Sequence, residues 1–131
     1  MSMQEGVRVV RAGQRSGATP QTPGMKREAG VAPETTGSQG LWMGLVTTPA
    51  GMVSGWHHHG EYESAIYVVE GAIRMEFGPG GNESFDAGPG DFVYVPKHAV
   101  HRESDPASQR STIVVVRAGH GEPVFNVDGP E

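Results

Sequence analysis

Residues 56–63 read Trp56-His57-His58-His59-Gly60-Glu61-Tyr62-Glu63. This stretch holds three of the six histidines of the chain and two carboxylates. Side chains two positions apart in a β-strand lie on one face, so we expect His57 and His59 to point inward together and His58 to point away. Two imidazoles on one face are typical of a transition-metal site. A solvated polar turn is the alternative interpretation of the same run.

A second stretch, residues 90–101, reads Gly90-Asp91-Phe92-Val93-Tyr94-Val95-Pro96-Lys97-His98-Ala99-Val100-His101. It describes a Gly-Asp turn, a short apolar strand, a proline that ends the strand, and a histidine at the start of the next one. We expect His101 to supply a third imidazole from across the fold. His98 is expected to occupy a turn, because histidine tolerates left-handed backbone angles better than most residues.

Outward from these stretches, turn residues interrupt apolar runs every 8–12 residues or so, the spacing of a β-sandwich or barrel. Twenty glycines and ten prolines favour short elements joined by tight turns. No helix is expected after Leu41. We expect a hairpin turn at residues 78–82 rather than a phosphate loop, because neither a helix pattern nor GK[ST] follows. The predicted strands are Leu41–Thr47, Met52–His58, Ser64–Glu70, Ala72–Phe77, Glu83–Asp86, Phe92–Val95, Val100–Ser104, Ser111–Arg117 and Val124–Val127.

The two stretches resemble, in the right order, the two signature motifs of the cupin superfamily. The first is Gly51-x5-His57-x-His59 ending at Gly71, and the second is Gly90-x5-Pro96-x4-His101. The resemblance covers about residues 41–117. It implies an all-β fold, a double-stranded β-helix or jelly-roll barrel, with one divalent transition metal held by His57, His59 and His101. Iron, manganese, nickel and zinc all remain open as the metal.

The fourth ligand of the family is usually a glutamate, and here the sequence departs from the pattern. The family spacing, counted back from Gly71, ends on Ser64, whereas Glu63 lies one residue earlier. Either a β-bulge turns Glu63 inward, or a water replaces the carboxylate. We expect Glu63 to be the ligand.

Residues 1–40 are predicted to form an N-terminal arm, partly extended, and residues 41–131 the barrel domain. The arm is either partly disordered or docked as an edge strand, on its own barrel or on a neighbouring subunit. It carries five basic and three acidic side chains, against five and twelve in residues 41–131. An acidic barrel without a long apolar run argues against nucleic acid and membrane as partners. We expect a cytoplasmic protein, and the resemblance implies a homodimer.

Three histidines and one carboxylate leave positions on an octahedral ion open for a ligand. The first hypothesis is therefore a metal-dependent dioxygenase or isomerase acting on a small organic molecule. The second is a non-catalytic protein that binds or senses a small molecule with the help of the metal, since fold does not fix function. A structural role with an empty site is the third and least favoured.

Overall fold

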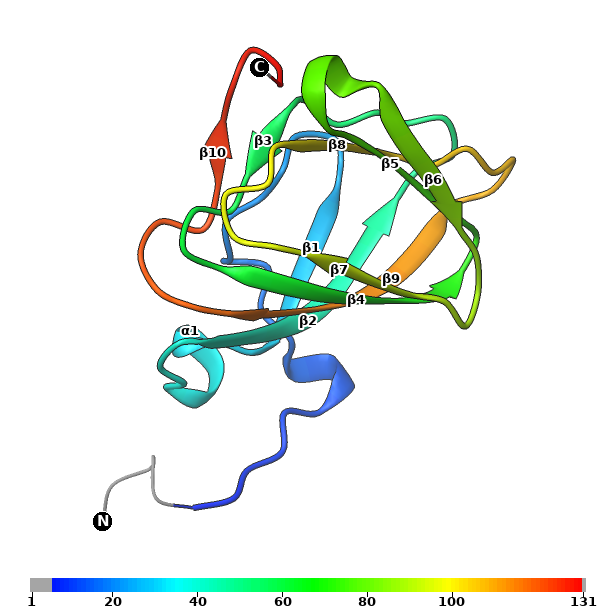
Figure 1. Cartoon of the computed structure of the whole chain (residues 1–131). Coiled ribbons are helices and arrows are strands. Elements are labelled where there is room, and N and C mark those ends of the chain that lie inside the picture. Colours follow the sequence, from blue (N-terminus) through cyan, green and yellow to red (C-terminus); the bar gives the residue numbers. More distant parts are fainter. Residues whose placement is uncertain (1–5, 131) are drawn as a thin grey trace.

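A computed structural model describes residues 6–130 of the chain. Two five-stranded antiparallel sheets face each other and enclose the core (Figure 1). The all-β prediction is confirmed. The first sheet has the order β1 (Lys26–Val31), β2 (Leu41–Thr48), β9 (Ser111–Ala118), β4 (Glu63–Glu70), β7 (Phe92–Val95). The second has the order β10 (Phe125–Asn126), β3 (His57–His58), β8 (His101–Ser104), β5 (Ile73–Phe77), β6 (Glu83–Ala87).

The core lies between the sheets because the long strands alternate buried and exposed residues. In β9 the side chains of Ser111, Ile113, Val115 and Arg117 are buried, and the intervening ones are partly exposed. Such period-two burial is the pattern of a sheet with one face on the core. The apolar core comprises Met25, Ala29, Ala32, Trp42, Val46, Ile66, Val68, Ile73, Met75, Ala87, Val93, Val95, Ile113 and Val115.

The second half of the predicted arm is part of the barrel. Lys26–Val31 forms β1, which pairs antiparallel with β2 from Lys26 opposite Thr47 onward. A one-turn helix, α1 (Pro33–Thr36), then leads into β2 and ends at Gly37, whose φ of 70° suits a residue without a Cβ atom. Two 3-10 turns, η1 (Ala12–Gln14) and η2 (Pro79–Gly81), complete the described helices. None of these helices is long and apolar enough to cross a membrane.

The strand predicted at Met52–His58 is interrupted, because pairing remains only at Val53, opposite Ser104, and at His57 and His58. Ser54 explains the interruption. Its backbone N–H donates to the Glu103 carbonyl at 2.7 Å, and its hydroxyl accepts from the Glu103 N–H at 2.9 Å. A side chain thus takes the place of a ladder partner. The hairpin predicted at residues 78–82 is confirmed, since β5 and β6 pair antiparallel around η2.

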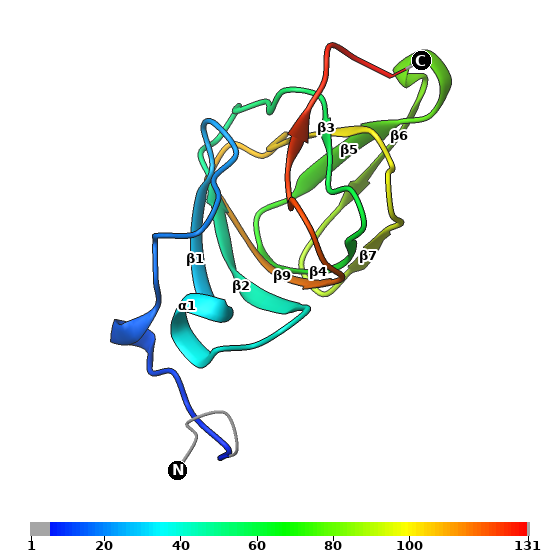
Figure 2. The ribbon, with the colours of Figure 1, turned by 90° about the vertical axis from the view of Figure 1, so that its left-hand side faces the viewer.

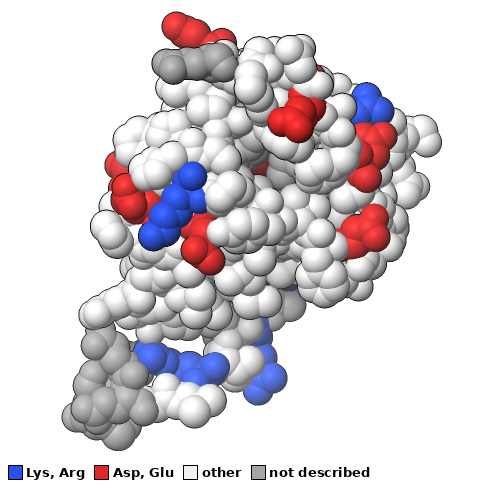
Figure 3. Space-filling view, in the orientation of Figure 1, with Lys and Arg blue, Asp and Glu red and all other residues white. Residues whose placement is uncertain are grey.

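Figure 2 shows β10, the last strand, at the side of the barrel, with the C-terminal end beyond it. On the face shown in Figure 3, basic side chains gather near the N-terminal segment, and acidic side chains are scattered over the barrel. This distribution agrees with the unequal charge of the two parts of the sequence.

Candidate metal centre

Four buried side chains meet in the barrel interior: His57, His59, His101 and Glu103. Each offers one ligand atom, and the four atoms lie within 4.8 Å of one another. The ring centroids of His57 and His101 are 4.4 Å apart, and those of His59 and His101 are 5.2 Å apart. A separation of this size lets the four groups converge on a single ion after small side-chain movements.

Strands β3 and β8 of the second sheet and the residue directly after β3 position the four groups. His57 on β3 stands directly opposite His101 on β8 in the antiparallel register. His59 follows two residues after His57, and Glu103 two residues after His101, so each pair shares the inward face of its segment. Alternation along two neighbouring chain segments therefore brings four ligand atoms together.

Backbone carbonyls hold the three imidazoles in one orientation. The Nδ1 atoms of His57, His59 and His101 lie 2.9, 2.8 and 2.9 Å from the carbonyl oxygens of Gly55, Pro123 and Ala99. A carbonyl only accepts hydrogen bonds, so each Nδ1 carries a proton. The Nε2 atoms of His57 and His59 keep their lone pairs, whereas Nε2 of His101 lies 3.2 Å from Oε1 of Glu103 and shares a proton with this carboxylate. Metal-binding histidines are oriented by this type of contact.

The Nε2 atom of His57 is buried and has no hydrogen-bond partner among the described residues. Buried polar atoms are almost always satisfied, so an orphan of this kind needs an explanation. Its nearest acceptor group is Glu103, whose Oε1 lies 4.0 Å away and 3.2 Å from Nε2 of His101. A metal ion among these atoms would satisfy His57 and draw the carboxylate in.

Burial keeps the imidazoles of His57 and His59 neutral. Desolvation, together with the neighbouring His101, lowers the pKa of His57 to about 4. Desolvation and the charge of Arg117 lower the pKa of His59 to about 2. For Glu103, burial alone would raise the pKa, but the hydrogen bond with His101 and the charges of His101, His57 and Arg27 bring it below its ordinary value. Neutral imidazoles and an ionised carboxylate are the protonation states that bind metals.

The residues present therefore fit a divalent transition metal. Three imidazole nitrogens and one carboxylate oxygen suit zinc, iron, nickel and manganese, and leave an octahedral ion with two open positions. No thiolate competes, because the chain has no cysteine.

The structure brings together His57, His59 and His101, as the sequence predicted, but not Glu63. The predicted bulge is absent at this point of β4, which stays in regular register with β9 from Glu63 opposite Ala118 to Val68 opposite Ile113. Glu63 therefore faces outward and is exposed, while Ser64 is buried. The Ser64 hydroxyl has no partner among the described residues and lines a small space beside His59, His101 and Glu103.

Glu103 is the residue that the sequence interpretation missed. The signal was available, because His101-x-Glu103 has the same spacing as His57-x-His59. His58 is half-buried outside the cluster and accepts a hydrogen bond from the Gly60 N–H at 3.0 Å. His98 lies in a turn with a φ of 61°, as expected, and contacts Glu61 at 2.8 Å. His120 is exposed.

An apolar cavity of about 170 Å³ reaches the cluster. His101 lines it together with side chains from β5, β6 and β7 and the segment after β7, among them Met75, Phe77, Phe85, Val93 and Ala99. Ligand sites typically combine such apolar walls with a few convergent polar groups. This cavity gives a small organic molecule a route to the cluster.

The metal-free protein should lose stability as the pH falls from 7 to 4. The pKa of His57 is about 4 in the folded state against 6.5 ordinarily, so the unfolded chain takes up protons in this interval that the folded chain does not. At about 1.4 kcal/mol per pKa unit, His57 alone accounts for about 3 kcal/mol. Melting curves in chelator at several pH values measure the effect.

The matched variants for this test are His57→Asn and His120→Asn. The first removes the buried titrating group and should flatten the pH profile, whereas the second changes an exposed histidine and should not. A parent melting temperature that stays constant from pH 7 to 5 would contradict the assignment of a neutral, buried His57.

A family model described as the cupin domain matches residues 44–117. Three solved structures share the fold. The polyketide cyclase RemF from Streptomyces resistomycificus is 20% identical, with 93% of this chain and 86% of that chain covered and a TM-score of 0.74. KdgF from Halomonas sp. is 22% identical, with 79% and 87% covered and a TM-score of 0.63.

Oxalate decarboxylase from Bacillus subtilis is 20% identical, with 82% of this chain but only 28% of that longer chain covered, and a TM-score of 0.69. No curated protein matches the chain. These likenesses confirm the double-stranded β-helix fold.

Proposed function

The chain belongs to the cupin family, and from this premise we propose that it is a metal-dependent enzyme acting on a small organic molecule. The metal would be one divalent transition ion held by His57, His59, His101 and Glu103. Glu63, expected from the sequence to be the fourth ligand, is replaced by Glu103 in this proposal.

The observation that carries the proposal is the common orientation of the three imidazoles. Three separate carbonyls accept from Nδ1, so all three Nε2 atoms are directed to one place beside a buried carboxylate, where an ion would displace the proton that His101 and Glu103 share. Both nitrogens of a buried imidazole are normally satisfied, and Nε2 of His57 has no partner among the described residues, so an ion in the cluster would supply the missing contact.

A bound ion would supply Lewis-acid polarisation of a substrate oxygen. The chain's own groups account for binding and orientation. The apolar cavity beside His101 excludes water and fits the carbon body of the substrate. Ser64, whose buried hydroxyl lacks a partner, can donate a hydrogen bond to an oxygen in the space beside His59 and Glu103.

The reaction class is an isomerisation or ring closure through a polarised carbonyl, or a dioxygenation. The named cyclase among the structural neighbours is compatible with the first, and its identity to this chain is too low to carry more than the fold. The metal itself separates the two classes, because dioxygen chemistry needs a redox-active ion such as iron.

Elemental analysis of protein purified without a histidine tag tests the proposal. We expect about one transition-metal ion per chain, removable by chelator. Iron together with oxygen consumption would assign a dioxygenase, and zinc or nickel an isomerase or cyclase. Protein that binds metal but turns over no carbonyl or enol substrate would be a binding or sensing protein instead. Protein that neither contains nor takes up a metal would refute the proposal.

We also propose a homodimer packed through the outer face of the first sheet. This face carries Leu41 and Met43 on β2, Tyr67 on β4, and Phe92 and Tyr94 on β7, all large apolar side chains with at least 39% exposure. The Tyr67 and Phe92 rings lie side by side, with centroids 4.9 Å apart. An exposed apolar face of this kind is typical of a protein interface.

Phe92→Glu should convert the dimer to a monomer, because it places a charge where an apolar contact is expected. Light scattering coupled to size-exclusion chromatography measures the mass. Val53→Glu is the matched control, since Val53 is exposed outside this face and should leave the mass unchanged. A parent protein that is monomeric at micromolar concentration would contradict the dimer.

A further inference from the structure

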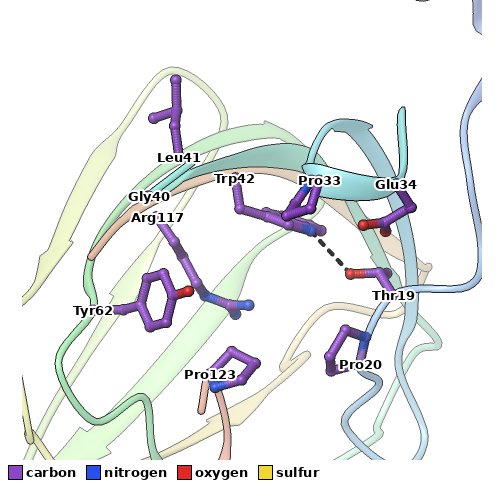
Figure 4. Close-up of a pocket in the computed structure, with 10 residues that line it drawn as sticks. All are labelled: Thr19, Pro20, Pro33, Glu34, Gly40, Leu41, Trp42, Tyr62, Arg117 and Pro123. Carbon is purple, nitrogen blue, oxygen red and sulfur yellow. Dashed lines mark hydrogen bonds between the residues drawn. The ribbon is translucent and has the colours of Figure 1, made fainter. Parts of the chain in front are cut away.

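A second cavity, of about 200 Å³, lies at the start of β2 and the end of β9 (Figure 4). Its walls include Trp42, Tyr62 and Pro123, and its rim includes Thr19 and Glu34 from the N-terminal part of the chain. Residues 19 and 34 precede the region matched by the family model. This cavity does not share its lining with the apolar cavity beside His101.

The guanidinium group of Arg117 points into this cavity between Tyr62, Pro20 and Pro123 (Figure 4). Arg117 is only 5% exposed. Within residues 6–130, its guanidinium makes no hydrogen bond or ion pair, and its Nε is buried without a partner. A buried arginine is normally paired, because removing the charge from water is costly.

The charged groups around Arg117 leave an excess of buried positive charge. Arg27 on β1 is also buried, at 2% exposure, and its Nε lacks a partner among the described residues. Burial is the main cause that lowers the pKa of Arg117 to about 9, and the like charge of Arg27 adds to it. Glu103 is the one carboxylate that acts on both arginines, and it also belongs to the metal cluster. Two cations thus share one anion.

The shape of the cavity limits what can bind there. An apolar cavity of about 150 Å³ holds benzene in a protein interior, so about 200 Å³ suits one ring with a small substituent. Trp42 is fixed, because its Nε1–H donates to the Thr19 hydroxyl at 2.9 Å. The guanidinium carbon of Arg117 lies 5.4 Å from the centroid of the Trp42 ring, a contact that supplies no negative charge, and the Tyr62 ring offers a second aromatic wall.

We propose that this cavity binds a small organic anion, a carboxylate carried on a single ring, with the carboxylate on Arg117. Guanidinium and carboxylate match in geometry and charge, and their hydrogen bonds are among the strongest in proteins. Arg117 also lines the small space beside His59 and Glu103, so the anion would lie next to the metal cluster, but its binding does not require a metal.

Benzoate is the probe, with benzyl alcohol as its uncharged counterpart, titrated against the full-length protein by calorimetry and by tryptophan fluorescence. We expect benzoate to bind and benzyl alcohol to bind at least about tenfold more weakly, since a charge-assisted hydrogen bond contributes about 1.5–3 kcal/mol. The titration is repeated in chelator. Binding that disappears with the metal would place benzoate on the metal and overturn the proposal, whereas the metal site would stand.

Arg117→Met removes the charge and keeps much of the volume, and it should weaken benzoate binding by about 10–100-fold. Arg110→Met is the matched control, because Arg110 is an exposed arginine beside Glu70, and it should leave the benzoate affinity unchanged. If the Arg117 variant does not fold, Glu34→Gln tests the same site from its exposed rim. Removing this negative charge should tighten benzoate binding by about two- to fivefold. Unchanged affinity in Glu34→Gln, or undiminished binding in a folded Arg117→Met, would overturn the proposal.

Discussion

Glu103→Gln should weaken the binding of a divalent metal by at least about 100-fold, whereas Glu63→Gln should leave it within a few-fold. Partners that only orient a metal ligand typically change affinity by about 10–100-fold when mutated, so the loss of a ligand should cost at least as much. Glu103 is buried beside the histidines, and Glu63 is exposed on the outer face of β4.

The pair is well matched, because both changes replace a carboxylate by an amide of the same shape. Zinc or manganese titrations against a competing chelator measure both affinities under one set of conditions. Circular dichroism checks that Glu103→Gln still folds. If the Glu63 variant loses metal while the Glu103 variant retains it, Glu63 points to the barrel interior and the description of β4 is wrong.

His101→Ala should abolish the thermal stabilisation that a metal gives to the parent protein. An ion that binds only the folded state at a hundredfold excess over Kd contributes about 2.7 kcal/mol, which corresponds to a rise in Tm on the order of 10 °C for a domain of this size. His101 lies opposite His57 and beside Glu103, so its loss opens one side of the cluster.

The comparison is made within each variant, with metal and with chelator, because removing a buried side chain lowers stability by itself. His58→Ala and His98→Asn are the controls. Asparagine is chosen at position 98 because the left-handed φ of 61° disfavours alanine. Both controls should keep the metal-dependent rise in Tm. A His101 variant with an undiminished rise would exclude His101 as a ligand.

The histidine part of the centre was predictable because it depends on local rules. Strand alternation places His57 and His59 on one face, and the spacing of the second stretch places His101 at the start of a strand. That His101 reaches the other two histidines depends on the pairing of β3 with β8, which the resemblance to the cupin motifs implied. The left-handed turn at His98 and the hairpin at residues 78–82 follow in the same way from the preferences of single residues.

The carboxylate was not predictable from the family spacing, because the spacing identifies a position and not the side chain that fills it. That position is Ser64, and the negative charge comes from Glu103 on a different strand. The sequence interpretation chose Glu63, one residue before Ser64, as the ligand. Neighbouring residues of a strand without a bulge point to opposite faces, so Glu63 cannot point to the interior when Ser64 does. To predict that a carboxylate on β8 replaces the one missing from β4, one must know that the two strands meet in the barrel interior.

The N-terminal segment shows the same limit. Lys26–Val31 alternates weakly, and the arginine in it has an unusual place for a charged residue, in the interior. Solvent-facing arginine is the rule, so composition alone favours an arm over a barrel strand. Only the pairing of β1 with β2 reveals that Arg27 faces inward.

The hydrogen bond from His59 to the Pro123 carbonyl links the metal centre to the C-terminal tail. The tail lies beyond residue 117, where the match to the family model ends. Two barrels with identical ligands can therefore differ in how firmly one imidazole is held, according to the length and composition of their tails. Substitutions in the tail would therefore be expected to change the metal preference, or the rate at which the metal is exchanged, while all ligands stay the same. For the same reason, a chain trimmed to residues 44–117 would keep His57, His59, His101 and Glu103 and lose the Pro123 carbonyl that holds His59.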